Sequence, residues 1–276
     1  MSKLKLKKIH PRMLLGLILI AVMLVMSFAV GIFSPHDPMA TDPLLRLNAP
    51  TLSHICGTDD VGRDILTRMA MGMRVSLGIA VAVTCASGLV GITVGVMSAY
   101  WPSTAKILMR IVDGIMSFPA IILAILLAGI LGAGTSNIII ALSISSFPSI
   151  ARVAKSAATD VLSKEYLESA VILGKSDGYI ITRYILPNIA SRLIVQITYT
   201  FAMAILYESV LSFLGVGIKV PTPSLGGMVS DGRSYISIAP WVITFPGLAI
   251  SCVVFGLNMV GDGLKDMFDP RRNKRG

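Results

Sequence analysis

The sequence predicts an all-α membrane protein, a polytopic bundle of about six transmembrane helices. Of its 276 residues, 54% are hydrophobic and only 14% are charged, whereas about a quarter of an ordinary soluble domain is charged. Four stretches that lack Asp, Glu, Lys and Arg hold 24, 31, 38 and 28 residues, and a helix needs about 20 residues to cross a bilayer. This composition excludes soluble folds, disordered chains and disulfide scaffolds.

The apolar stretches define the expected spans. A fifth stretch, from Leu193 to Ile218, is interrupted by Glu208 alone. The 38-residue stretch is divided by a glycine-rich turn at 132–137, so the third span must begin before Asp113. The six spans are expected at 13–33, 75–100, 106–131, 137–156, 193–218 and 238–260.

Two local patterns inside these spans predict packing. Arg110 and Asp113 are spaced i, i+3 in the third span and are expected to pair, which lowers the cost of placing either charge in a membrane. Gly88, Gly91 and Gly95 recur at helical spacing in the second span and favour close approach of a neighbouring helix.

Positive charge sets the expected orientation. With both termini in the cytoplasm, 18 of the 24 Lys and Arg residues lie inside and six outside, as the positive-inside rule requires. The net charge of +9 therefore indicates anionic lipid of the bilayer, not nucleic acid, as a partner. We expect a multi-pass protein of the cell (inner) membrane. Its first apolar run, 13–33, exceeds the roughly 7–15 residues of a signal-peptide core and is expected to stay as an anchor.

The chain divides into three expected segments. Residues 1–34 form the N-terminal tail and first anchor helix, residues 35–74 an extracytoplasmic loop, and residues 75–276 a five-span core with a cytoplasmic loop at 157–192. The cysteines, Cys56, Cys85 and Cys252, are odd in number and far apart, so we predict no disulfide framework and no metal cluster.

The cytoplasmic loop is expected to be a bent pair of helices. Periodicity predicts a helix to about Leu173 that ends at Gly174. Ser176 or Asp177 can cap a second short helix, and Pro187 is expected to stop it where the chain re-enters the membrane. The first helix carries more apolar residues than a solvated loop would, which indicates a protein partner.

This loop resembles the EAA loop of ABC importer permeases. The resemblance rests on Glu168-Ser169-Ala170, followed by Gly174 and Pro187, with Ser169 and Tyr184 as departures from the usual Ala and Ile. It implies that the short helix docks on a cytoplasmic ATPase subunit and transmits its closure. The implied ATPase-coupling residues are Glu168, Ala170, Gly174, Lys175, Ser176, Asp177 and Pro187.

The run Gly174-Lys175-Ser176 looks like the end of a phosphate-binding loop. The glycine required five residues before Gly174 is absent, because Ser169 stands there, and no strand is expected before it. We therefore predict that the chain is not an enzyme and binds no cofactor, with ATP-Mg held by separate ATPase subunits.

The outer segments narrow the resemblance to the peptide and nickel branch of these permeases. Residues 57–64 and 72–77 look like its opening segment, and 208–217, 221–226 and 261–271 are similar to its later blocks, with Leu225 in place of a usual Trp. Ser117-Phe118-Pro119 in the third span fits as well. The resemblance thus runs from about Gly57 to Arg271.

The opening segment has its own physical pattern. Asp64 and Arg68 are spaced as an i, i+4 pair, and an apolar stripe follows, as in a helix that lies at the outer interface or packs on the bundle mouth. We expect this region either to contact a substrate-binding protein or to brace the first span. The candidate contact residues are Asp59, Arg63, Asp64 and Pro223.

Ionisable residues inside a membrane are functional candidates. Glu208 has no obvious local partner and is expected to line the substrate pathway or to pair with a partner subunit. Asp262 is expected to face Lys265 at i+3 in a structural role.

The resemblance implies the permease subunit of an ATP-driven importer of di- or oligopeptides, the second of a heterodimeric pair. Its partners would be a homologous permease, two ATPase subunits and an external binding protein. Import of nickel or a nickel chelate is the first alternative, and a secondary carrier or channel a remote one. A proton-coupled carrier would need His or carboxylate relays at mid-membrane, but His10, His36 and His54 all lie outside the spans. A membrane-anchored enzyme is disfavoured because no Ser/His/Asp or metal-ligand constellation can be assembled from these three histidines.

Overall fold

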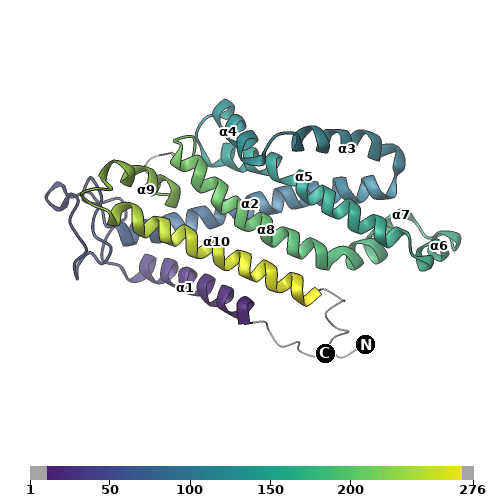
Figure 1. The fold of residues 1–276 in the computed structure, drawn as a ribbon, viewed down its shortest axis with the longest axis horizontal. Coiled ribbons are helices and arrows are strands. Elements are labelled where there is room, and N and C mark those ends of the chain that lie inside the picture. Colours follow the sequence, from purple (N-terminus) through teal and green to yellow (C-terminus); the bar gives the residue numbers. More distant parts are fainter. Residues whose placement is uncertain (1–10, 220, 269–276) are drawn as a thin grey trace.

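The computed structural model describes residues 11–219 and 221–268, and these form an elongated helical bundle without a strand. Four long helices make its body and run along its long axis (Figure 1). The helix α1 (Pro11–Phe33) packs on the outside against α10 and α2. The basic tails at 1–10 and 269–276 lie outside the described residues. The four long helices are α2 (Ile65–Tyr100), α5 (Thr135–Leu162), α8 (Leu186–Phe213) and α10 (Trp241–Phe268).

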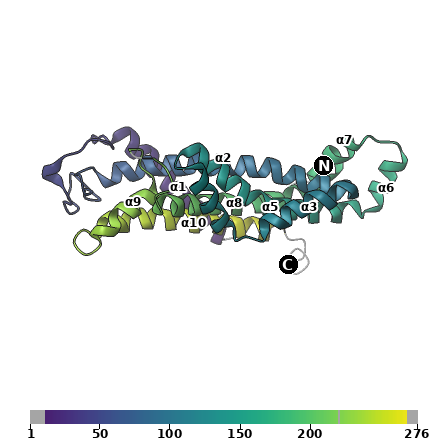
Figure 2. The same ribbon diagram turned by 90° about the horizontal axis from the view of Figure 1, so that it is seen from above.

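The connecting segments gather at opposite ends of the bundle (Figure 2). One end carries α6 (Glu165–Ile172) and α7 (Asp177–Ile180), and we call it the α6 end. The other carries the irregular segment 34–64 and α9 (Leu225–Gly232), and we call it the α9 end. Short 3-10 turns at Pro43–Leu45 and Arg233–Tyr235 also lie there.

The expected class, an all-α bundle with about six spans, is confirmed. Five helices of the described chain are long and apolar enough to cross a membrane. The third span is not the continuous helix expected at 106–131. It is broken into α3 (Pro102–Met116) and α4 (Ala120–Leu131), which meet at 88°. The break falls at Ser117-Phe118-Pro119 because proline lacks an N–H and disfavours helical backbone at the residue before it.

The second span begins ten residues earlier than expected. Asp64 caps α2 by accepting a hydrogen bond from the Thr67 backbone N–H at 2.8 Å. Its first turns bury the predicted apolar stripe, with Ile65 and Met73 almost inaccessible. The predicted interface helix is therefore the start of α2, packed on the bundle mouth. At 36 residues, α2 is roughly 54 Å long, longer than the hydrocarbon core of a bilayer is thick.

The expectation that Pro187 stops the second loop helix is wrong. The chain stays helical from Asp177 to Phe213, and Pro187 lies in the first turn of α8. A π-helical turn, Ile181–Ile185, precedes it, and the Leu186 N–H donates to the Ile181 carbonyl across five residues. This wider turn accommodates the proline ring and its missing N–H, so the helix continues.

Two of the pairs expected within one helix are replaced by partners from another helix. Arg152 of α5 donates to Asp113 of α3 at 2.8 Å, in place of Arg110. The Tyr199 hydroxyl of α8 donates to Asp262 of α10, in place of Lys265. These residues lie where α3 packs on α5 and α10 on α8, so a neighbouring helix brings the nearer partner.

Two of the three predicted glycines let α2 and α5 touch. A Cβ at Gly91 would come within 2.8 Å of Ile150, and one at Gly95 within 2.4 Å of the Ala151 carbonyl oxygen. A Cβ at Gly88 would meet nothing within 4 Å, so the prediction is wrong for Gly88. The contact between α1 and α10 is equally close, since a Cβ at Gly16 would lie 2.6 Å from the Gly256 carbonyl oxygen.

Candidate functional site

The connection between α5 and α8 folds as a bent helical loop fixed by its own apolar core. Leu167 of α6 is buried with Ile180 and Ile185, against side chains of α2, α5 and α8. Ala170, a predicted coupling residue, is buried as well. The core around Leu167 thus attaches the loop to the long helices.

Gly174 makes the bend between α6 and α7. Its φ of +68° is left-handed, a conformation that glycine adopts without steric cost. The Lys175 N–H donates to the Ala170 carbonyl at 3.2 Å, which closes the helix end in the manner of a Schellman motif. A helix and not a strand precedes Gly174, so the surroundings of Gly174-Lys175-Ser176 differ from those of a phosphate-binding loop.

The tip of this loop presents apolar side chains to the surroundings. Ile172 and Leu173 are 84% and 75% exposed at the α6 end of the molecule. Glu168, Lys175 and Ser176 are exposed beside them. An apolar tip surrounded by polar groups is typical of a surface that a protein partner covers.

Asp177 ties the loop to α2. Its carboxylate accepts a hydrogen bond of 2.8 Å from the Tyr100 hydroxyl at the last turn of α2. The ring of Tyr184, a departure from the EAA pattern, is tilted against the Tyr166 ring and edge-on to the Tyr179 ring, with centroids 6.2 and 6.0 Å away. The loop is thus anchored to the bundle through aromatic and polar contacts as well as its core.

At the α9 end, Asp59 organises the segment before α2. Its carboxylate accepts from the Arg63 side chain at 2.6 Å and from two backbone N–H groups. Arg68 approaches the same carboxylate at 3.3 Å. The expected pairing of Arg68 with Asp64 is therefore wrong, because Asp64 is occupied with capping α2 and turns away from Arg68.

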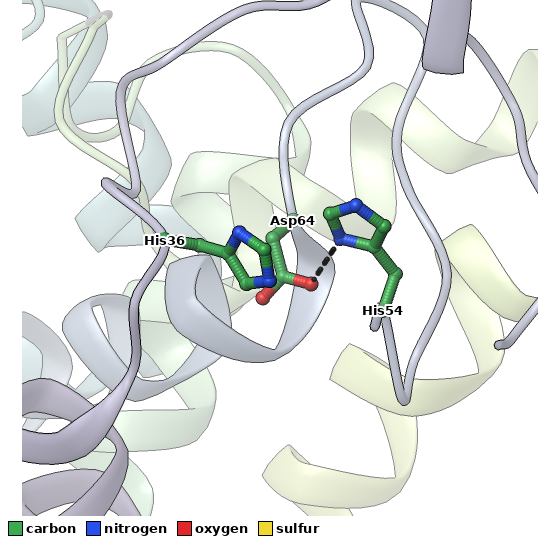
Figure 3. Close-up of side chains that lie close together, drawn as sticks. All are labelled: His36, His54 and Asp64. Atoms are coloured by element: carbon green, nitrogen blue, oxygen red, sulfur yellow. Dashed lines mark hydrogen bonds and ion pairs between the residues drawn. The ribbon is translucent and has the colours of Figure 1, made fainter. Parts of the chain in front are cut away.

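Asp64 meets two histidines that the sequence places far apart (Figure 3). His54 Nδ1 lies 3.0 Å from its carboxylate, and the His36 ring stacks on the His54 ring at 4.5 Å. Ligand atoms of the three residues lie within 4.8 Å of one another. The sequence pattern did not predict this cluster, because its three members are far apart in the segment 34–64 and folding brings them together.

The cluster fits a structural clasp better than a metal site. A metal needs ring nitrogens that point at a common centre, whereas the two rings present their faces to each other. His36 Nε2 already bonds the Ser53 carbonyl at 2.9 Å, and the second oxygen of Asp64 accepts from Thr67. We assign the three residues to fastening the segment 34–64 onto α2.

The four predicted contact residues of the outer loops fall into different surroundings. Arg63 and Pro223 line one hollow of about 300 Å³ between the segment before α2 and α9. Asp59 holds Arg63 in that place, and Asp64 belongs to the histidine clasp. Asp59, Asp64 and Pro223 are all buried, which favours the brace over direct contact with a binding protein.

Glu208 is buried inside the chain between α2 and α8. Its two carboxylate oxygens accept hydrogen bonds from Ser76 at 2.6 Å and from Ser212 at 2.7 Å. Ser76, far away in sequence, is the partner that local spacing could not reveal. These bonds join α2 to α8 near the α9 end and satisfy a polar group that would otherwise be costly in a membrane.

The fold is similar to that of a chain in a solved transporter. It superposes on a chain of the inward-facing MetNI methionine ABC transporter with a TM-score of 0.61, at 19% identity, over 73% of this chain and 97% of that one. The two chains therefore share a fold.

The comparisons with other sequences are more specific. Residues 91–274 match the family of binding-protein-dependent transport system inner membrane components. The chain is 39% identical to a putative peptide transport system permease protein of Brucella abortus, over 97% of this chain and 90% of that one. It is 38% identical to the dipeptide permease DppC of Alkalihalophilus pseudofirmus (94% and 85% covered) and 35% to the oligopeptide permease OppC of Bacillus subtilis (95% and 86%). The chain belongs to this family of inner membrane components.

The Glu208 site predicts a measurable loss of stability. In Glu208→Ala two buried hydroxyls lose their acceptor, which costs about 1–3 kcal/mol for each group that stays unsatisfied. We expect a lower Tm of the purified protein in detergent. The neighbouring Ser209→Ala is the matched control, because the buried Ser209 hydroxyl has no hydrogen-bond partner among the described residues. Equal Tm values for the two variants would contradict the assignment.

Proposed function

We propose that this chain is one of two related permease subunits in an ATP-driven importer that moves di- or oligopeptides into the cytoplasm. Two ATPase subunits would dock at the α6 end, and an external binding protein would deliver substrate at the α9 end. Both termini would lie in the cytoplasm. The permease would contribute two states of different affinity for its partners, and no chemistry of its own.

The observation that carries this proposal is the bent loop with its exposed tip. Ile172 and Leu173 offer an apolar docking surface, Gly174 sets its angle, and the core around Leu167 connects it to α5 and α8. A force on the tip would therefore move two spans together. A secondary carrier or channel would have no use for such a loop.

Peptide is favoured over nickel as the substrate. The relatives described above are named as peptide, dipeptide and oligopeptide permeases, and this chain covers most of their length. The histidine cluster at the α9 end groups side chains of the kind that bind metals, but it is better explained as a clasp.

The direct test is ATPase activity of the assembled complex in lipid, with its binding protein carrying either a peptide or chelated nickel. We expect stimulation several-fold above the unloaded state by peptide alone. Stimulation by nickel chelate alone would make nickel, and not peptide, the substrate. A complex without any ATPase activity would remove the importer proposal altogether.

The bend at Gly174 predicts uncoupling in the same assay. Gly174→Val places a branched side chain at a φ of +68°, which costs roughly 1–2 kcal/mol and shifts the loop. We expect ATP hydrolysis to continue while peptide uptake per ATP falls. The control is Gly78→Val in α2, outside the loop, where a Cβ also meets nothing within 4 Å but φ is not left-handed. Normal coupling in Gly174→Val would contradict the role of the bend.

The orientation can be tested by labelling with a membrane-impermeant maleimide. Leu52→Cys, fully exposed at the α9 end, is expected to react in intact cells or spheroplasts. Lys164→Cys, exposed at the α6 end, is expected to react only after the membrane is opened. Background from Cys56 is low, because burial, with a further contribution from Asp64, raises the pKa of its thiol to about 11. The reverse labelling pattern would invert the topology.

A further inference from the structure

A hollow of about 440 Å³ lies where the third span is broken. Its wall is formed by the α3–α4 break and by facing side chains of α5 and α8. Interrupted helices are tolerated at membrane depth when the break is buried in protein or lines a water-filled cavity. Met116, Phe118 and Pro119 at the break are exposed on the open side of the hollow. The break is thus part of a cavity wall.

The lining is mostly apolar surface, but it includes several uncharged polar side chains and no charged one. Ser145, Ser146 and Ser149 come from α5, and Gln196, Thr200 and Tyr207 from α8. The rest of the lining is apolar or aromatic, with two methionines, apart from Tyr199. So many hydroxyl and amide groups are unusual within spans that are otherwise apolar, and polar groups there face a cavity or the bundle interior.

Some of these polar groups have no hydrogen-bond partner, or only a distant one, among the described residues. The hydroxyls of Ser146 and Tyr207 make no hydrogen bond within the described residues, and the Gln196 amide reaches Ser149 only at 3.4 Å. Other hydroxyls return to their own helix, as Thr200 does to the Gln196 carbonyl at 3.0 Å. Donors and acceptors are therefore available to something that enters the hollow.

The hollow continues toward the α6 end. A second hollow of about 590 Å³, between α5, α8 and α10, shares Gln196 and Tyr199 with the first. Both are lined by one face of α8, whose members recur every three or four residues. These are Asn188, Arg192, Gln196, Tyr199, Met203 and Tyr207. A single helix face thus joins the middle of the bundle to the expected cytoplasmic end.

We propose that the first hollow is a binding station for the peptide main chain during transport, with Ser146, Gln196 and Tyr207 exchanging hydrogen bonds with substrate amides. Serine, glutamine and tyrosine side chains can each donate and accept, which matches an amide N–H and C=O. The uncharged lining accepts peptides whatever the charge of their side chains. It also contains no His, Cys, Asp or Glu, the ligands that a transition metal would need. This inference rests on the proposed peptide transport.

The test introduces charge into the hollow and measures selectivity. The reconstituted complex, with binding protein saturated, transports two tripeptides that differ only in a central Glu or Lys. We expect Ser146→Asp to lower uptake of the Glu peptide relative to the Lys peptide, and Ser146→Lys to do the opposite, by roughly threefold to tenfold. Thr198→Val on α8, which faces Gly261 of α10 and lines neither hollow, is the control.

Tyr207→Phe keeps the test interpretable if a charged variant fails to assemble. It removes one hydroxyl and keeps the ring, and we expect peptide uptake to fall at least roughly threefold, about 0.65 kcal/mol, with an unchanged yield of the complex. Unchanged selectivity in both Ser146 variants, or wild-type uptake in Tyr207→Phe, would overturn the binding station. If the wild-type complex transports neither peptide, the proposed function itself fails. The two failures are therefore distinguishable.

Discussion

The close contact of α2 with α5 at Gly91 and Gly95 is the interaction on which the arrangement of the bundle depends. Lipid tails are as apolar as the helices, so the hydrophobic effect does not drive helices together in a membrane. Close backbone approach supplies dense packing instead. It holds α5 beside a helix that reaches both ends of the molecule. At the α9 end, α2 begins in the clasp of Asp64 with His54, and at the α6 end it ends at Tyr100, bonded to Asp177. One helix therefore connects the outer segment with the coupling loop.

Much of the fold could be predicted from the sequence, because a bilayer imposes simple rules. Charge-free stretches mark spans, since each charge inside hydrocarbon is expensive, and the glycine at 174 marks a helix end because its backbone is left-handed. The third-span break was signalled only by Pro119, and the sequence does not tell whether a proline kinks a helix or turns it by 88°. Pro187 shows the opposite outcome, as a preceding π turn absorbs it.

The residues that local spacing misjudged have partners from distant segments. Asp113 pairs with Arg152, Glu208 with Ser76, and Asp64 with His54. Spacing at i+3 or i+4 identifies neighbours on one helix, but packing brings another helix equally close. Only the motif blocks pointed to function, and they pointed to the coupling loop. The hollow at the break had no local signal, because its lining is assembled from four helices.

The π turn before α8 also fixes the phase of that helix. Each residue of an α-helix advances the chain by about 100° around its axis, and a π turn contains one residue more than an α turn. The five residues Ile181–Ile185 thus set which side of α8 faces the hollows for a given direction of α7. Change their number by one, and the polar wall rotates by more than a quarter turn toward lipid or a neighbouring helix. The number of residues in the π turn therefore sets the angle between the docking loop and the cavity wall, whatever the hydrophobicity of those residues.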